Sequence, residues 1–208
     1  MLSAQRRTWF EGFRLLALLT IVLAALCVWI AGMRQFEVDG VRMVIRFTAR
    51  TSLLMFCLAF SASALARLVP NAFTRWQKRN RRYLGLTFAA SHALHALAII
   101  AFAKMDPAGF AIATNLASYV FGGIGYAVII AMAATSFDRT AAAIGPHAWQ
   151  LLHRVGGYYL LLQFMVSFGK RIPAMPLYSL FLIPLFAVLA LRLIAMAAAK
   201  HRQTVSAG

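Results

Sequence analysis

The sequence predicts an all-α polytopic membrane protein, folded as a bundle of six transmembrane helices. The 208 residues are 62% hydrophobic and only 12% charged, whereas about 25% of the residues of a soluble domain are charged. Apolar segments long enough to cross a bilayer recur along the whole chain. We expect a single domain, residues 1–208, because the stretches outside these segments are too short to bury a core of their own.

Turn and helix-breaking residues separate the apolar segments. Pro70 and Asn71 end the second segment, and a turn that contains Pro107 separates the third from the fourth. Pro146 is well placed to begin the fifth, since proline is favoured in the first turn of a helix. The stretches between segments, including 136–146 and the basic stretch after Asn71, are expected to be loops. The six predicted spans are residues 13–33, 43–67, 83–103, 110–134, 147–168 and 175–199.

The net charge of +16 reflects Lys and Arg residues that gather in the short connections between apolar segments. This distribution is typical of the positive-inside rule of membrane proteins. It favours membrane lipid as the surroundings of the chain, and we expect no nucleic acid partner. Six spans place both termini on one side, and that side carries most of the 21 Lys and Arg residues. We therefore predict that both termini are cytoplasmic.

Three histidines inside the apolar segments are the candidate functional residues. His92 and His95 lie three residues apart on one face of the third span, and His153 lies on the fifth. Ionisable groups within a membrane usually mark function. One helix cannot supply both axial ligands of a heme, because the ligands approach the ring from opposite faces. A second helix must contribute, and His153 is the candidate there.

The three histidines allow more than one interpretation. Ligation of a b-type heme iron needs two imidazoles and an apolar slot, whereas zinc fits poorly because no Cys, Asp or Glu joins the histidines inside the spans. Interhelical hydrogen bonding, or a proton or metal-ion carrier, are the alternatives. At about 1.5 Å of rise per residue, His92 matches the depth of His153 better than His95 does. Both His92 and His95 therefore remain candidates at this point.

Arginines and glycines near the histidines have two interpretations each. Arg42, Arg46 and Arg50 form one stripe near the outer start of the second span. They can snorkel to lipid headgroups or pair with heme propionates, and Arg50 is the deepest. The small residues of the fourth and fifth spans suit either close helix packing or room for a heme. These residues are Gly122, Gly123, Gly125, Gly156 and Gly157.

Two short motifs resemble those of a known family. The first is Arg81-Arg82-Tyr83-Leu84-Gly85-Leu86, followed ten residues after the glycine by His95, and the second is Trp149-Gln150-Leu151-Leu152-His153-Arg154. Together with six spans, they resemble the ferric reductase-like transmembrane domain family. In size and layout the chain is most similar to the bacterial heme-binding membrane subunits of methionine sulfoxide reductase systems.

The resemblance implies a heme protein of the bacterial inner (plasma) membrane that relays electrons as the membrane component of an oxidoreductase. It assigns His95 and His153 as ligands of heme b iron. The family usually has a second histidine thirteen residues after His153, where this chain has Val166, so one heme is expected rather than two. The chain has no flavin or NAD domain, so a separate donor, a flavin reductase or a quinone, is expected, with a periplasmic protein as possible acceptor. The departure at Val166 also motivates an alternative, a heme-free membrane anchor or assembly partner.

Overall fold

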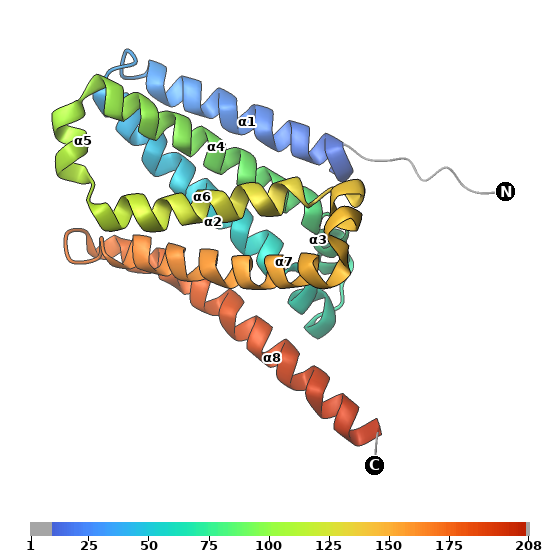
Figure 1. The fold of residues 1–208 in the computed structure, drawn as a ribbon. Coiled ribbons are helices and arrows are strands. Elements are labelled where there is room, and N and C mark those ends of the chain that lie inside the picture. The colour runs from blue at the N-terminus through green and yellow to red at the C-terminus, as the bar shows by residue number, and fades with distance from the viewer. Residues whose placement is uncertain (1–9, 207–208) are drawn as a thin grey trace. The chain divides into compact units, whose positions relative to one another are not determined.

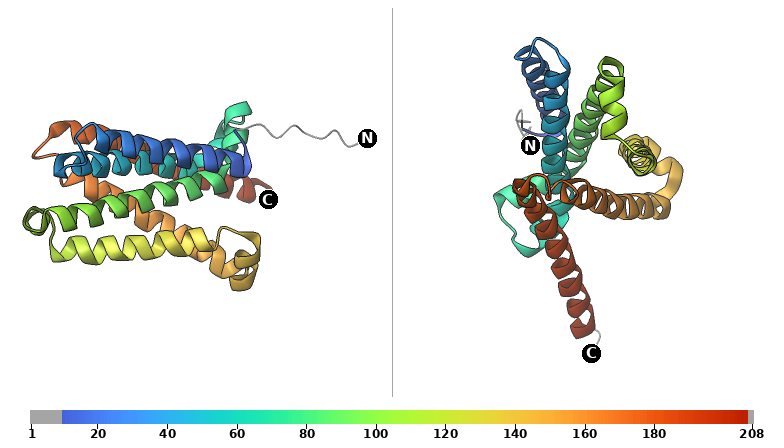
Figure 2. Two further views of the ribbon diagram at one scale, coloured as in Figure 1. Left: turned by 90° about the horizontal axis from the view of Figure 1, so that it is seen from above. Right: turned by 90° about the vertical axis from the view of Figure 1, so that its left-hand side faces the viewer.

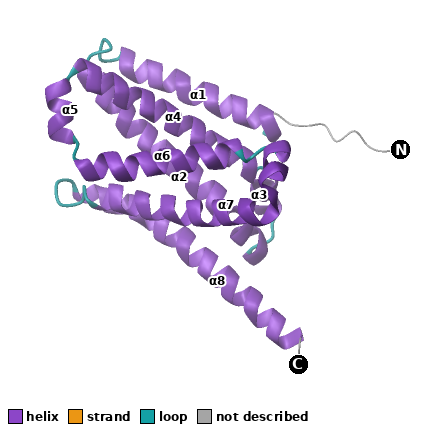
Figure 3. Cartoon of the chain, viewed as in Figure 1, coloured by secondary structure: helices purple, strands orange, loops and turns teal. Residues whose placement is uncertain are grey.

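A computed structural model describes residues 10–206, with side chains described as far as His201. All the regular elements in this part of the chain are helices (Figures 1 and 3). Arg6 and Arg7, which contribute to the predicted cytoplasmic charge, lie outside the described residues. The elements are α1 Gly12–Gly32, α2 Val38–Leu68, α3 Ala72–Arg79, α4 Arg81–Met105, α5 Pro107–Ala113, α6 Leu116–Ala134, α7 Asp138–Gly169, the 3-10 helix η1 Pro176–Phe181 and α8 Leu182–Ser206.

Five helical stretches of the described chain are long and apolar enough to cross a membrane: α1, α2, α4, α6 and the combined stretch Pro176–His201. The prediction of a helical membrane protein is confirmed at this level. Helix α7 has 32 residues and is long enough to cross a membrane, but by its composition it is not one of the five candidate spans. It contains His153, Arg154 and Gln163. The sixth span therefore stays a prediction.

The structure corrects two of the predicted loops. The basic stretch after Asn71 contains the short helix α3, which begins with a reciprocal cap: the Asn71 side chain accepts from the Thr74 amide at 2.9 Å, and the Asn71 amide donates to the Thr74 hydroxyl at 3.0 Å. Such capping boxes stabilise helix starts. The predicted loop 136–146 is mostly helical, because α7 begins at Asp138 and bends at Gly145. The Gly145 backbone, with φ 77° and ψ 162°, is accessible mainly to glycine, and the helix resumes at Pro146 as expected.

The fourth predicted span, 110–134, is also wrong at its start. Thr114 has an extended backbone, with φ −122° and ψ 155°, and separates α5 from α6. The side chain of Asn115 then accepts a hydrogen bond from the Ser118 amide at 2.9 Å, which caps the new helix. The apolar composition of this stretch concealed the break, since hydropathy does not report local capping.

The described chain divides into two compact units. Unit 1 comprises residues up to Phe56 together with Arg82–Tyr119, and unit 2 comprises Cys57–Arg81 and the residues from Val120 onward. Helix α2 contributes its first part to unit 1 and its last part to unit 2. The prediction of one domain stays a prediction.

Unit 1 is built around the contact of α1, α2 and α4. Cys27 of α1, Val44 of α2, and Ala98 and Phe102 of α4 belong to one buried cluster. The turn between α1 and α2 is tight, since a Cβ added to Gly40 would lie 3.0 Å from the carbonyl oxygen of Ala31. This close turn lays the start of α2 against α1, which lies alongside it (Figure 2).

Unit 2 packs α7 against α6 and the end of α2 through glycines. A Cβ on Gly156 would lie 2.8 Å from Met132 Sδ and 2.9 Å from Val128 Cγ1, and one on Gly157 would lie 3.0 Å from the Phe60 ring. Close helix packing thus accounts for these two glycines, whereas nothing lies within 4 Å of a Cβ at Gly123. Helix α8 starts beside the end of α7 and diverges from it toward the C-terminus (Figures 1 and 2).

The substitution Gly156→Ala is expected to lower the free energy of unfolding by about 1–3 kcal/mol, the usual cost of overpacking. Gly123→Ala is the matched control and should leave stability within about 0.5 kcal/mol or raise it, because alanine is the better helix former. Reversible unfolding in mixed detergent micelles measures both. Equal losses in the two variants would contradict the packing role of Gly156.

Candidate functional site

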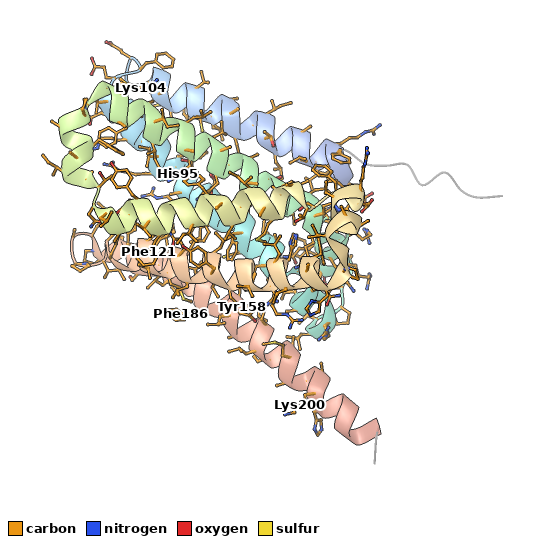
Figure 4. The ribbon with its side chains drawn as sticks, in the orientation of Figure 1. His95, Lys104, Phe121, Tyr158, Phe186 and Lys200 are labelled. Carbon is orange, nitrogen blue, oxygen red and sulfur yellow. The ribbon has the colours of Figure 1, made fainter. Side chains whose placement is uncertain are left out.

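The candidate histidines lie in both units. His92 and His95 belong to α4 in unit 1, and His153 belongs to α7 in unit 2. Figure 4 labels His95 on α4. All three side chains are partly buried.

The His95 ring is oriented by a threonine of the neighbouring helix. Nδ1 of His95 lies 2.9 Å from the hydroxyl oxygen of Thr48 on α2, and Thr48 is fully buried. The same hydroxyl lies 2.7 Å from the carbonyl oxygen of Val44, one turn earlier. Because a hydroxyl has one proton and Val44 offers only an acceptor, the Thr48 proton goes to Val44, and the Thr48 oxygen accepts from Nδ1–H of His95.

This arrangement assigns the tautomer of His95. With the proton on Nδ1, the lone pair of the neutral ring is on Nε2. A metal-binding histidine commonly donates its other ring N–H to a neighbouring oxygen, which sets both tautomer and ring orientation. His95 and Thr48 have this relation in the structure, with Nε2 as the nitrogen suited to ligation.

A cluster of hydroxyl side chains surrounds Thr48 at the contact of α2 with α4. We call Thr48, Thr51, Ser52 and Ser91 the hydroxyl cluster. The Ser91 oxygen lies 2.9 Å from that of Ser52 and 3.0 Å from that of Thr51. Ser52 and Ser91 are fully buried. Sequence reasoning missed this cluster, although the i, i+3, i+4 spacing on α2 and the i, i+4 spacing of Ser91 and His95 on α4 were available signals.

His92 shares a face of α4 with His95. The two ring centroids are 5.4 Å apart, with 40° between the planes. On its other side His92 contacts Phe88, at 5.2 Å between centroids. The structure thus brings the two histidines together, and the side chain whose ring meets a buried threonine of α2 is His95.

His153 is held by a second threonine, through the other ring nitrogen. Nε2 of His153 lies 3.2 Å from the Thr135 hydroxyl, and that hydroxyl donates to the Ala131 carbonyl at 2.7 Å. The Trp149 ring lies against the His153 ring, with the centroids 4.5 Å apart and 31° between the planes, and its indole N–H donates to the Thr135 carbonyl at 2.9 Å. Because the Thr135 hydroxyl gives its proton to the Ala131 carbonyl, its oxygen accepts from Nε2–H of His153. Ligation of a metal through Nε2 would replace this hydrogen bond.

The arginine stripe of α2 is exposed. Arg42, Arg46 and Arg50 are all exposed in unit 1, and the Arg42 guanidinium lies 5.4 Å from the centroid of the Phe102 ring. This position along α2 suits contact with an anionic group approaching from outside the unit. The assignment of Arg50 to a heme propionate stays a prediction.

Metal-ligating side chains do not gather further in this part of the chain. Among the described residues, no group of three or more His, Cys, Asp and Glu side chains is placed to hold a metal ion. Cys27 and Cys57 are buried and form no disulfide. In the described residues the candidate metal ligands are therefore individual histidine rings, and neighbouring side chains determine the orientation of each ring.

Comparison with known proteins adds no relative. No family model, curated protein or solved structure matches this chain. Membership of the ferric reductase-like family stays a prediction, based on the two motifs around His95 and His153.

Replacing Thr48 by valine keeps the shape of the side chain and removes the hydroxyl that meets His95. We expect Thr48→Val to lower the free energy of unfolding by about 0.6 kcal/mol and by no more than about 1.7 kcal/mol, the average and the largest value for hydrogen bonds between membrane helices. Thr48→Ser keeps the hydroxyl and serves as control, with a smaller loss. If valine and serine cost the same, the hydrogen bond would have no share in stability.

Proposed function

We propose that this chain is a membrane b-type heme protein that relays electrons within or across the bilayer as the membrane component of an oxidoreductase. The observation that carries the proposal is the relation of His95 to Thr48. A buried hydroxyl directs Nδ1–H of a membrane-helix histidine and leaves the lone pair on Nε2. That is the state in which an imidazole binds iron.

The proposal assigns the residues as follows. His95 is one axial ligand and His153 the other, with His92 as the alternative to His95. Thr48 orients the His95 ring, and Thr135 with Trp149 orients the His153 ring. Bound heme b would supply one-electron transfer at a potential set by its ligands and its burial. Arg50 is assigned to pairing with a heme carboxylate.

The chemistry of the donor set fits this cofactor. Neutral imidazoles on separate helices are the ligands that a b-type heme takes. The fit has a cost at His153, because ligation through Nε2 replaces its hydrogen bond to Thr135. At His95 no such exchange with Thr48 is needed, since that bond uses Nδ1.

The proposed number of hemes, the location and the electron partners are based on the sequence. One heme is proposed, because Val166 stands where a further histidine would be needed. The proposal includes the bacterial inner membrane as the location, with both termini in the cytoplasm. Electrons would come from a separate flavin reductase or a quinone and pass to an acceptor, which would be a periplasmic protein. The apolar helices of the chain support the membrane setting.

The reduced-minus-oxidised spectrum of the purified protein tests the proposal. Protein from heme-replete cells is expected to have a b-type spectrum. His153→Ala and His95→Ala should each abolish or convert it, because each removes an axial ligand, whereas His92→Ala should retain it. His147→Ala is the matched control, since His147 is an exposed histidine at the start of the same helical segment as His153.

A colourless preparation from heme-replete cells would overturn the heme proposal. A spectrum lost in His92→Ala and kept in His95→Ala would reverse the ligand assignment on α4 alone. Equal spectra in all four variants would refute the assignment of these histidines.

A second candidate function is a heme-free membrane anchor or assembly partner. It is favoured by the partners that the histidines already have within the protein, Thr48 for His95, and Thr135 and Trp149 for His153. Hydrogen bonds of this kind hold helices together. The spectrum separates the two candidates.

A further inference from the structure

Two arginines of unit 2 meet α2 on one turn. Nη1 of Arg81, the first residue of α4, lies 3.3 Å from the Ser63 hydroxyl oxygen. Nη1 of Arg192, on α8, donates to the Phe60 carbonyl at 3.1 Å. Phe60 and Ser63 are three residues apart and therefore neighbours on the surface of α2. We call Arg81 and Arg192 the arginine pair.

Aromatic rings hold one member of the pair in place. The Arg192 guanidinium lies 4.1 Å from the centroid of the Phe60 ring and 5.3 Å from that of Tyr158. The two rings contact each other at 90°, with centroids 5.5 Å apart. Such cation–π contacts orient a guanidinium and partly compensate for its loss of water. They leave its positive charge in place.

No carboxylate of the described residues forms an ion pair with either arginine. The one acidic residue in the sequence of unit 2, Asp138, is exposed at the start of α7. Both arginines are partly buried, and the charge of Arg192 acts on that of Arg81. Two like charges withdrawn from water near each other are costly unless an anion joins them.

The surroundings of the pair indicate what kind of anion would fit. Met196 lies one turn after Arg192 on the same face of α8 and is 49% exposed, so the helix beside the pair offers an apolar surface. Arg67 donates to the Ala195 carbonyl at 3.3 Å and adds positive charge where α2 and α8 meet. An amphiphile with an anionic head and apolar tails matches both features.

We infer that Arg81 and Arg192 bind a phosphate group, supplied by the headgroup of an anionic phospholipid. Guanidinium groups match phosphate oxygens in geometry and charge. Basic pockets between membrane helices on the cytoplasmic side bind anionic headgroups in this way. The inference goes beyond the proposed electron transfer and does not depend on it. Free phosphate shares the same chemistry, and the experiment separates the two sources.

Native mass spectrometry of the detergent-purified chain measures how tightly each lipid binds. Phosphatidylglycerol is expected to bind at least about tenfold more tightly than phosphatidylcholine. Arg81→Gln and Arg192→Gln should each weaken phosphatidylglycerol binding about tenfold or more, since each removes hydrogen bonds to a charged group. Arg139→Gln is the matched control, because it removes one exposed positive charge of unit 2 and should change binding less than twofold.

Competition with inorganic phosphate shows whether the bound phosphate group belongs to a lipid or comes from solution. Phosphatidylglycerol that resists millimolar phosphate supports a lipid site. If phosphate alone displaces the lipid and fails to bind the two glutamine variants, the arginine pair is a phosphate site supplied from solution. That result would support phosphate binding by the arginine pair and would overturn the inference that a phospholipid supplies the phosphate. Arg81→Lys and Arg192→Lys keep the charge and protect the test against misfolding; each should still lose several-fold in affinity.

Three further results would overturn the inference. The first is equal affinity for the two lipids, and the second is an equal loss in Arg139→Gln. The third is lipid binding that is confined to heme-free protein, since the pair would then serve the heme carboxylates. A protein that lacks heme but binds phosphatidylglycerol as described would overturn the proposed function and leave this inference standing.

Discussion

Polar groups within apolar helices must find their partners inside the protein, because lipid offers none. The contact of α2 with α4 in unit 1 follows from this constraint. Ser52, Thr51 and Ser91 satisfy one another across the two helices, and Thr48 brings His95 into the same set. The helices cannot rotate about their axes without breaking several of these bonds at once. The orientation of the candidate ligand thus depends on the packing of α2 with α4.

A threonine hydroxyl orients each of the two candidate ligands, but it contacts a different ring nitrogen in each. Thr48 and Thr135 each donate to the carbonyl four residues earlier and accept from a ring nitrogen. Thr48 meets Nδ1 of His95, whereas Thr135 meets Nε2 of His153. His95 is therefore held with Nε2 suited to iron, whereas His153 would exchange a hydrogen bond if its Nε2 bound iron. This difference makes Thr135 a residue whose role changes if a heme is bound.

Positive charge in unit 2 has two physical settings. Residues such as Arg75 and Lys78 of α3 are exposed, as is usual for basic residues in the connections between membrane helices. Arg81 and Arg192 are partly buried and are held against α2 by hydrogen bonds and aromatic rings. A net charge of +16 does not separate these cases, but local burial and contacts do. The arginine pair therefore supports a specific anion site.

The sequence by itself determined the helical class, the apolar helices and the candidate histidines, because hydrophobic length and intramembrane charge are properties of local composition. It did not reveal α3 or the break between α5 and α6, which depend on capping by side chains such as Asn71 and Asn115. The tertiary structure alone decided that Thr48 meets His95 and that Arg192 meets Phe60. These pairs lie 47 and 132 residues apart, and their contact depends on how each helix is rotated about its axis against its neighbour.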